Sequence, residues 1–294
     1  MLLLAALVWG VAFVAQSEGL NYVGAFTFNT CRFILGGAVL IPCIYFLHGR
    51  KDSAWQILSE KEKKEQTRMG IIGGICCGCI LCLASCLQQF GIAQTTVGKA
   101  GFITTLYIII VPFMGLFLKK KIGINIWISA VIAAVGMYFL CITESFSIGA
   151  GDRLVLMCSV VFSVHILVID HFSPKADGVV ISCVQFFTAG VIASVLMLLF
   201  EHPSVSAVIA AAAPILYAGV MSCGIGYTLQ VVAQNGVDPT VASLLLSLES
   251  VFSVLAGWML LGQKLSGREL FGCVLVFAAV LLVQIPTEKL FHTA

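Results

Sequence analysis

Long apolar runs, separated by short charged or turn-rich breaks, dominate the chain. The hydrocarbon core of a bilayer is about 30 Å thick, so a run of about 20 apolar residues suffices for one helix to cross it. The pattern predicts ten such spans, at residues 1–16, 26–47, 69–90, 100–118, 123–142, 152–169, 178–200, 208–233, 239–261 and 269–286. We therefore expect an all-α, polytopic membrane protein.

The two ends of this pattern and its longest break fit the same picture. The chain begins with MLLLAALVWG, which has neither a basic leader nor a small-residue cleavage site, so we expect a first span here rather than a signal peptide. The longest break, residues 48–68, is rich in mixed charges and predicts a short helix on the membrane surface. The other breaks are short, which predicts one membrane unit without a separate soluble domain.

Composition excludes a soluble protein. Of the 294 residues, 60% are hydrophobic and only 10% are charged, whereas a soluble domain carries about 25% charged residues. The net charge of +2 gives no reason to expect a nucleic-acid partner. We expect the partners to be the lipid bilayer and a small-molecule substrate.

Twelve cysteines raise the question of a metal site. Cys79, Cys82 and Cys86 share one helical face within the segment CCGCILCLASC. No histidine or acid accompanies them, as zinc ligands usually would, and a free cysteine packs as a small hydrophobic residue. The sequence therefore favours helix packing, and we predict neither a metal nor a cofactor.

Two halves of the chain resemble each other weakly. A shift of 153 positions places Trp9 on Phe162, Arg32 on Gln185, Phe33 on Phe186 and Gly37 on Gly190. A shift of 142 positions places Gln88 on Gln230, Ala100 on Ala242, Leu106 on Leu248 and Gly115 on Gly257. These matches predict two repeats, residues 1–143 with helices 1–5 and residues 150–286 with helices 6–10.

An odd number of spans per repeat has a consequence for topology. A second five-span unit must enter the membrane from the opposite side, so the two repeats are expected to be inverted about an axis in the membrane plane. One side of the membrane then holds eleven Lys and Arg residues and both termini, and the other side holds four. The positive-inside rule predicts that both termini are cytoplasmic.

One acid, Glu249, lies in the middle of the ninth span. It is about 15 Å from the start of that span, at the depth of the bilayer midplane. An acid there costs at least a few kcal/mol unless it is paired, hydrated or protonated. The shift of 142 equates it with Tyr107, and we expect the two to face each other across a central cavity. Glu249 is a candidate for binding a substrate ammonium group or for proton coupling; a purely structural tie between helices is the alternative.

Other polar residues within the spans are weaker candidates. Arg32 is a second buried charge, roughly 9 Å below the surface, and could snorkel outward, anchor helices, or meet an anionic substrate or Glu249. His165 is either a proton relay or, more often, a packing residue. Gly70, Gly74 and Gly78 predict a close-packing helix face. Pro112 and Pro214 lie within spans and are expected to kink them. No grouping typical of a catalytic site or of ATP binding is present.

Four segments resemble the EamA family of the drug/metabolite transporter superfamily: ALVWGVAF (6–13), CRFILGG (31–37), GKAGFITTLYIIIVPFMGLFLKKK (98–121) and ASLLLSLESVFSVLAGWMLLGQ (242–263). The resemblance covers essentially the whole chain. It implies two inverted five-helix repeats around a shared cavity, and export or exchange of small metabolites without ATP. Two positions depart from the family pattern. Ser250 stands where a proline usually follows the acid, so we expect a straighter ninth helix, and Gln263 stands where an acid is common.

These observations predict a secondary transporter of the plasma membrane, not an enzyme, that works by alternating access. The expected substrate-binding residues line a cavity between the first, third, fourth, sixth, eighth and ninth spans: Trp9, Gln88, Thr104, Tyr107, Gln230 and Glu249. Amino acids or related amphipathic compounds are the expected cargo. Two alternatives stay open, a passive channel or non-transporting receptor, and a lipid-modifying enzyme that would use Asp170, His171 and Asp177.

Overall fold

The computed structural model describes residues 1–50, 54–95, 97–119, 123–141, 148–261 and 266–283. Within these ranges the chain is helical and has no strand. The elements are α1 (Leu2–Gly19), α2 (Ala25–Gly49), α3 (Ala54–Ile57), α4 (Glu60–Ile92), α5 (Val97–Thr104), α6 (Tyr107–Phe117), α7 (Ile124–Cys141), α8 (Ala150–Phe172), α9 (Gly178–Phe200), α10 (Val205–Ala210), α11 (Ala212–Leu216), the π-helix η1 (Tyr217–Tyr227), α12 (Thr228–Gln234), α13 (Pro239–Leu246), α14 (Leu248–Leu261) and α15 (Gly267–Val283). The all-α class is therefore confirmed.

Eight helical stretches of the described chain are long and apolar enough to cross a membrane. They are Leu2–Gly19, Ala25–Gly49, Glu60–Ile92, Ala100–Phe117, Ala150–Phe172, Gly178–Phe200, Ala212–Gln234 and Pro239–Ala256. The remaining two predicted spans, 123–142 and 269–286, coincide with the shorter helices α7 and α15. The count of ten spans thus stays a prediction, while a multi-pass membrane protein is confirmed.

The charged segment 48–68 forms less of a surface helix than expected. Only the single turn α3 is separate, and the charged residues after it belong to α4. Ser59 starts α4 with a capping box: its hydroxyl accepts from the Glu62 amide, and the Glu62 carboxylate accepts from the Ser59 amide. Such a cap satisfies two N-terminal amides, so the charges extend the third span instead of lying apart from it.

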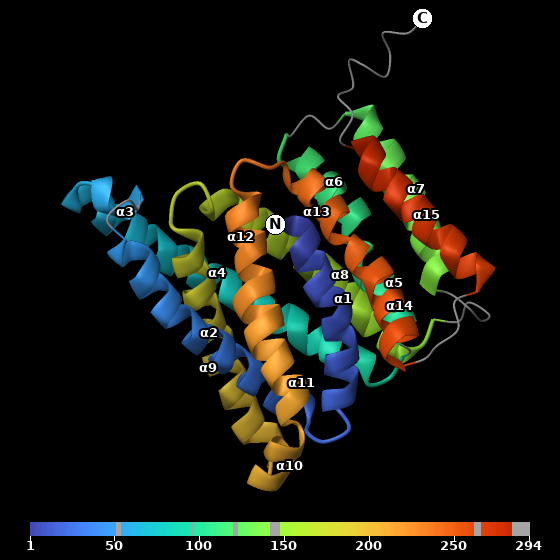
Figure 1. Cartoon of the computed structure of the whole chain (residues 1–294), viewed down its shortest axis with the longest axis horizontal. Coiled ribbons are helices and arrows are strands. Elements are labelled where there is room, and N and C mark those ends of the chain that lie inside the picture. Colours follow the sequence, from blue (N-terminus) through green and yellow to red (C-terminus); the bar gives the residue numbers. More distant parts are fainter. Residues whose placement is uncertain (51–53, 96, 120–122, 142–147, 262–265, 284–294) are drawn as a thin grey trace, which may run out of the picture.

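Helices that are distant in sequence pack side by side (Figure 1). Helix α7 lies along α15 at one edge of the molecule, and α2 lies along α9 toward the opposite edge. Between them α4 packs against α8 and α9, and α1 packs against α14 and η1. Most of these contacts join described residues before 142 to described residues from 150 onward, so the two parts of the chain are interlocked.

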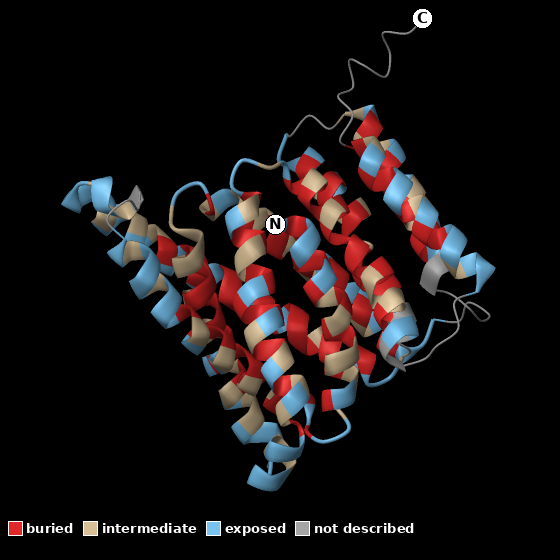
Figure 2. Cartoon of the chain, in the orientation of Figure 1, coloured by how far each residue is buried: buried red, intermediate tan, exposed pale blue. Residues whose placement is uncertain are grey.

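Burial follows from this packing (Figure 2). Buried residues line the faces where helices meet, whereas large apolar side chains such as Tyr45, Phe46, Leu198, Leu199 and Leu281 are exposed on the outer faces of α2, α9 and α15. An apolar outer surface is unfavourable in water but suits a helix surrounded by lipid tails.

The predicted glycine face of the third span is confirmed. A Cβ added at Gly74 would lie 2.5 Å from the Val184 Cβ, and one at Gly78 would lie 2.6 Å from the Gln185 carbonyl oxygen. Both neighbours belong to α9. Small residues let membrane helices approach closely and gain dispersion contacts, so this face fixes α4 against α9.

Several residues that the two sequence shifts equate contact each other. The rings of Phe33 and Phe186 stack with centroids 6.2 Å apart, and Tyr107 meets Glu249. The equivalent glycines Gly37 and Gly190 each pack against the other half of the chain. A Cβ on Gly37 would lie 3.0 Å from the Phe187 ring, and a Cβ on Gly190 would lie 3.0 Å from Ile34. Contacts of this kind occur where equivalent elements face each other near a common axis.

The fourth and ninth spans are both interrupted at the positions that the shift of 142 equates. One break separates α5 from α6 at Thr105 and Leu106, and the other separates α13 from α14 at Ser247. The Thr105 and Ser247 hydroxyls donate to carbonyls of their own helices, a bonding pattern that bends membrane helices. The ninth span is thus interrupted before Glu249, although Ser247 keeps helical backbone angles, and a straighter ninth helix stays a prediction. The break in the fourth span lies before Pro112 rather than at it.

Both ends of the α2–α9 pair carry polar contacts. At one end the Glu201 carboxylate accepts from the Phe26 and Thr27 amides, at 2.9 and 2.8 Å, and from the Thr27 hydroxyl at 2.6 Å. At the other end the His48 Nε2 lies 2.8 Å from the Asp177 Oδ2, and Asp177 also caps α9. Each helix is thus tied to the terminus of the other.

We expect Glu201→Ala to destabilise the fold, because it leaves two amides at the N-terminus of α2 without their carboxylate. Loss of such a cap costs about 1–2 kcal/mol, which should lower the melting temperature in detergent by roughly 2–6 °C. The control is Glu65→Ala, since Glu65 is exposed and its oxygen lies 3.6 Å from Arg68. Equal melting temperatures for the two variants would contradict the prediction.

Candidate functional site

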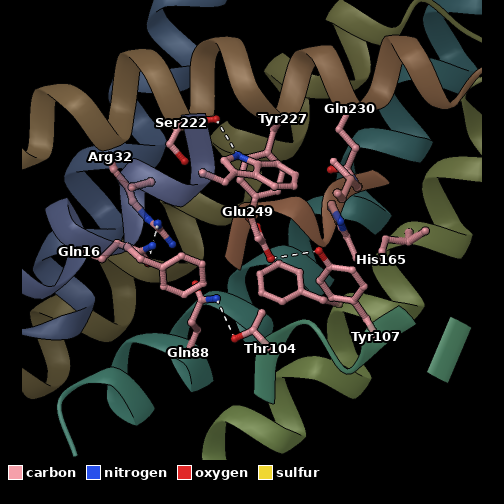
Figure 3. Close-up of a pocket in the computed structure, with 16 residues that line it drawn as sticks. Gln16, Arg32, Gln88, Thr104, Tyr107, His165, Ser222, Tyr227, Gln230 and Glu249 are labelled. Carbon is pink, nitrogen blue, oxygen red and sulfur yellow. Dashed lines mark hydrogen bonds between the residues drawn. The ribbon is translucent and has the colours of Figure 1, made fainter. Parts of the chain in front are cut away.

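A cavity lies in the middle of the bundle (Figure 3). Its volume is about 40 Å³, enough for a few water molecules at roughly 10–15 Å³ each. Seven of the eight long helical stretches contribute to its wall. The lining residues are Trp9, Ala12, Phe13, Gln16, Arg32, Gln88, Thr104, Tyr107, Phe162, His165, Ile166, Ser222, Tyr227, Gln230, Leu246 and Glu249.

All of the predicted site residues lie on this one wall. The six expected substrate contacts, Trp9, Gln88, Thr104, Tyr107, Gln230 and Glu249, are joined by the buried charge Arg32. Arg32 belongs to the second span, which was not among the six spans expected to line the cavity. The structure thus brings these side chains together, while their binding role remains a prediction.

Glu249 lies just beyond the break in the ninth span. It is in the first turn of α14 and only 4% exposed, so its carboxylate is near the positive end of that helix dipole. The Tyr107 hydroxyl, just beyond the matching break in the fourth span, donates to the Glu249 Oε1 at 3.0 Å. Among described residues Tyr107 is its one hydrogen-bond donor, and the expectation that these two side chains meet is confirmed.

Arg32 is buried rather than directed to the membrane surface, so the snorkelling alternative is wrong. It is 2% exposed, and its Nη1 donates to the Gln16 Oε1 at 3.1 Å. The guanidinium carbon lies 4.8 Å from the centre of the Phe33 ring, within cation–π range. No carboxylate of the described chain lies within ion-pair distance of it, Glu249 included.

An aromatic pair forms another part of the wall. The rings of Trp9 and Tyr227 have centroids 4.5 Å apart, and the Trp9 indole N–H donates to the Ser222 carbonyl at 3.4 Å. Ser222 and Tyr227 belong to the π-helix η1. Gly226 makes room for the indole, since a Cβ there would lie 2.6 Å from the Trp9 Nε1.

Sequence reasoning missed this π-helix and the contributions of Gln16, Ser222 and Tyr227. The available signal was the spacing of three glycines, Gly219, Gly224 and Gly226, within one span. Glycine in a helix interior is unfavourable and calls for a packing reason. π-Helical turns occur often at functional sites.

Amide side chains supply the remaining polar contacts. The Gln88 Nε2 donates to the Thr104 hydroxyl at 3.4 Å, and Gln230 is buried with its Oε1 unpartnered. His165 lies with its Nε2 3.1 Å from the Gln185 Oε1. A histidine with an amide partner is what the packing alternative expects, and a role as proton relay remains a prediction.

Two of the residues named for the enzyme alternative, Asp177 and His171, have structural partners. Asp177 caps α9 and pairs with His48, and the His171 Nε2 lies 2.7 Å from the Lys175 Nζ. Across the described residues no three His, Cys, Asp or Glu side chains are grouped as metal ligands, and the eleven described cysteines are free.

Fold and site together define a class: a multi-pass helical membrane protein with a cavity at the centre of its bundle, lined by polar and aromatic side chains. Comparison with known proteins makes this specific. The model of the EamA-like transporter family matches residues 1–142 and 149–285. The chain therefore belongs to the EamA-like transporter family, which is part of the drug/metabolite transporter superfamily, and the family points to a transporter rather than an enzyme.

Two further comparisons concern a named transporter and a solved structure. An "Uncharacterized transporter" of Archaeoglobus fulgidus is 29% identical over 285 residues, which cover 97% of this chain and 84% of the relative. A solved crystal structure matches with a TM-score of 0.76 and 19% identity, over 98% of this chain and 96% of that one. At that identity the structural match shows the fold alone.

Proposed function

We propose that the protein is a secondary transporter that exports or exchanges small metabolites by alternating access, with amino acids or related amphipathic compounds as cargo. The observation that carries this proposal is the meeting of Glu249, Arg32 and their polar neighbours in one buried cavity. Ionisable residues inside a membrane are costly, and they mark substrate or ion pathways.

We propose further that α7 and α15 complete ten spans in two inverted modules, residues 1–143 and 150–286. The reciprocal contacts of Gly37 and Gly190, and the two helix breaks at equivalent positions, support this arrangement. The packing of the helices supports it too. Contacts of α1 with α14 have a counterpart in those of α8 with α6, and contacts of α2 with η1 have one in those of α9 with α4.

The size of the cavity bears on the transport cycle. At about 40 Å³ the cavity is small, and in the proposed cycle the lining helices move apart to admit cargo. The breaks beside Thr105 and Ser247 give the fourth and ninth spans points at which half-helices can shift. Discontinuous helices near the midplane are typical of transporter binding sites.

Glu249 has two roles in the proposed cycle. As a carboxylate it binds a substrate ammonium group, and when it takes up a proton it releases that group. One carboxyl group that serves proton and substrate in turn couples their movements in opposite directions. Trp9 and Tyr107 are the aromatic walls, and Gln88, Thr104 and Gln230 offer hydrogen bonds.

We propose a plasma-membrane location with both termini in the cytoplasm. Lys and Arg favour the cytoplasmic side of a span, and the charged residues at the start of α4 lie at one end of the bundle. The His48–Asp177 contact places the turn between α8 and α9, with Lys175, at that same end.

Counterflow in proteoliposomes tests this function against its alternatives. Vesicles are loaded with a pool of unlabelled metabolites, and uptake of each labelled candidate is followed from outside. We expect preloading to accelerate uptake of the true cargo, since a transporter exchanges one molecule for another. Uptake that ignores preloading would favour a passive channel, and no uptake of any candidate would favour a receptor.

A further inference from the structure

The cavity wall holds two opposite charges that do not neutralise each other. Arg32 reaches it from α2, and Glu249 reaches it from α14 (Figure 3). Each has its own neutral partner, Gln16 for the guanidinium and Tyr107 for the carboxylate. Neither is within ion-pair distance of a described residue of opposite charge, although both are at least 96% buried.

Both charges keep hydrogen-bonding capacity. A guanidinium has five N–H donors, and the structure gives Arg32 one hydrogen bond, to Gln16, while its buried Nε has no partner. On the acidic side, Oε1 of Glu249 accepts from Tyr107, and Oε2 accepts from no described residue. Buried charges are expected to be paired and fully hydrogen-bonded, so each side of the cavity is suited to one charged group of a ligand.

We infer that the site recognises a zwitterion, with the carboxylate of the solute on Arg32 and its ammonium group on Glu249. This inference rests on the proposed transport function and adds a second charged contact to it. A zwitterion satisfies both buried charges and adds no net charge to the cavity. A simple amine leaves Arg32 unpaired, and a simple carboxylic acid leaves Glu249 unpaired; an unpaired charge at this depth is costly.

The aromatic residues agree with this polarity. The Tyr107 hydroxyl and the Trp9–Tyr227 ring pair line the same cavity as Glu249, and ring faces attract cations. Phe33, which does not line the cavity, faces the Arg32 guanidinium. The ammonium end of a solute is therefore placed among aromatic rings and the carboxylate end beside the guanidinium.

Three solute pools test the inference on purified protein by thermal shift in detergent. The first holds the twenty standard amino acids with β-alanine and 4-aminobutyrate, so that the spacing of the two charges varies. The second holds the matching amines without a carboxyl group, and the third holds the matching carboxylic acids without an amino group. We expect only the zwitterion pool to stabilise the protein, because a ligand stabilises the state that it binds.

Charge variants then assign the two contacts. We expect Arg32→Gln to weaken binding of the zwitterions by about 10- to 100-fold, which is the effect of losing one charged hydrogen-bonded contact. The variant should then bind amines as well as it binds zwitterions. Arg32→Lys keeps the charge and should keep the preference for zwitterions. Arg153→Gln, at an exposed arginine near the start of α8, is the matched control and should behave as the wild type.

The outcomes separate the inference from the function on which it rests. Equal stabilisation by the amine pool or the acid pool, or an unchanged preference in Arg32→Gln, overturns zwitterion recognition. Stabilisation by none of the three pools also overturns zwitterion recognition. The pool experiment uses the wild-type protein, so it remains decisive even if the Arg32→Gln variant fails to fold. Counterflow of some other metabolite would leave the transporter proposal intact in each case.

Discussion

Replacing Glu249 by Gln should lower transport of the cargo found by counterflow by about 10- to 100-fold and remove its dependence on a proton gradient. The amide keeps the size of the side chain and can still accept from the Tyr107 hydroxyl, which lies 3.0 Å from Oε1. It can neither hold a proton nor pair with an ammonium group, and a charged hydrogen bond contributes about 1.5–3 kcal/mol. Flux into proteoliposomes, measured over a series of pH values with and without a gradient, gives the result.

Glu60→Gln is the matched control, because Glu60 is exposed at the start of α4, where it pairs with Lys63 at 3.0 Å. Its flux and pH dependence should equal those of the wild type. If Glu249→Gln retains both the rate and the pH dependence, the coupling role of Glu249 is eliminated, and a structural tie to Tyr107 becomes the better account.

Introducing a side chain at Gly10 should disturb both stability and transport. A Cβ at Gly10 in α1 would lie 2.6 Å from the Phe252 Cβ and 2.8 Å from the Glu249 carbonyl oxygen in α14. These atoms belong to or adjoin the α14 backbone and cannot rotate away, so Gly10→Val must push the two helices apart. Overpacking of this kind costs about 1–3 kcal/mol, and we expect the melting temperature to fall by roughly 3–10 °C.

The same displacement moves the helix that carries Glu249, so flux should fall as well. Gly49→Val is the control, since no atom lies within 4 Å of a Cβ at Gly49; it should melt and transport like the wild type. A Gly10→Val protein with normal melting and normal flux would show that α1 and α14 are less closely packed than described.

Sequence reasoning reached the site through two simple properties. Glu249 and Arg32 were conspicuous because charges are rare inside apolar spans, and Tyr107 followed from the shift of 142 that equates it with Glu249. The glycines of α4 followed from their spacing. A charge or a glycine inside a membrane helix is energetically unfavourable by itself, so its presence there indicates a compensating contact.

Other features depended on three-dimensional context. In the π-helix η1, Gly226 packs against Trp9, a residue far away in the chain, and the glycine spacing alone does not identify that partner. The ninth span is interrupted at Ser247, where a serine hydroxyl competes for a backbone carbonyl, although Ser250 replaces the expected proline. Arg32 lies inward, where its contacts are with Gln16 and Phe33, and neither contact is visible in the local sequence.

The ties at both ends of α2 and α9 constrain how this molecule can move. A motion that parts residues 1–143 from 150–286 as two solid blocks would have to break the Glu201 cap and the His48–Asp177 contact together. A motion in which α2 and α9 move together as one rigid pair, while the half-helices around Glu249 and Tyr107 rotate relative to that pair, keeps both contacts. In the proposed transport cycle, the hinge would then lie inside each of the two proposed repeats and not between them.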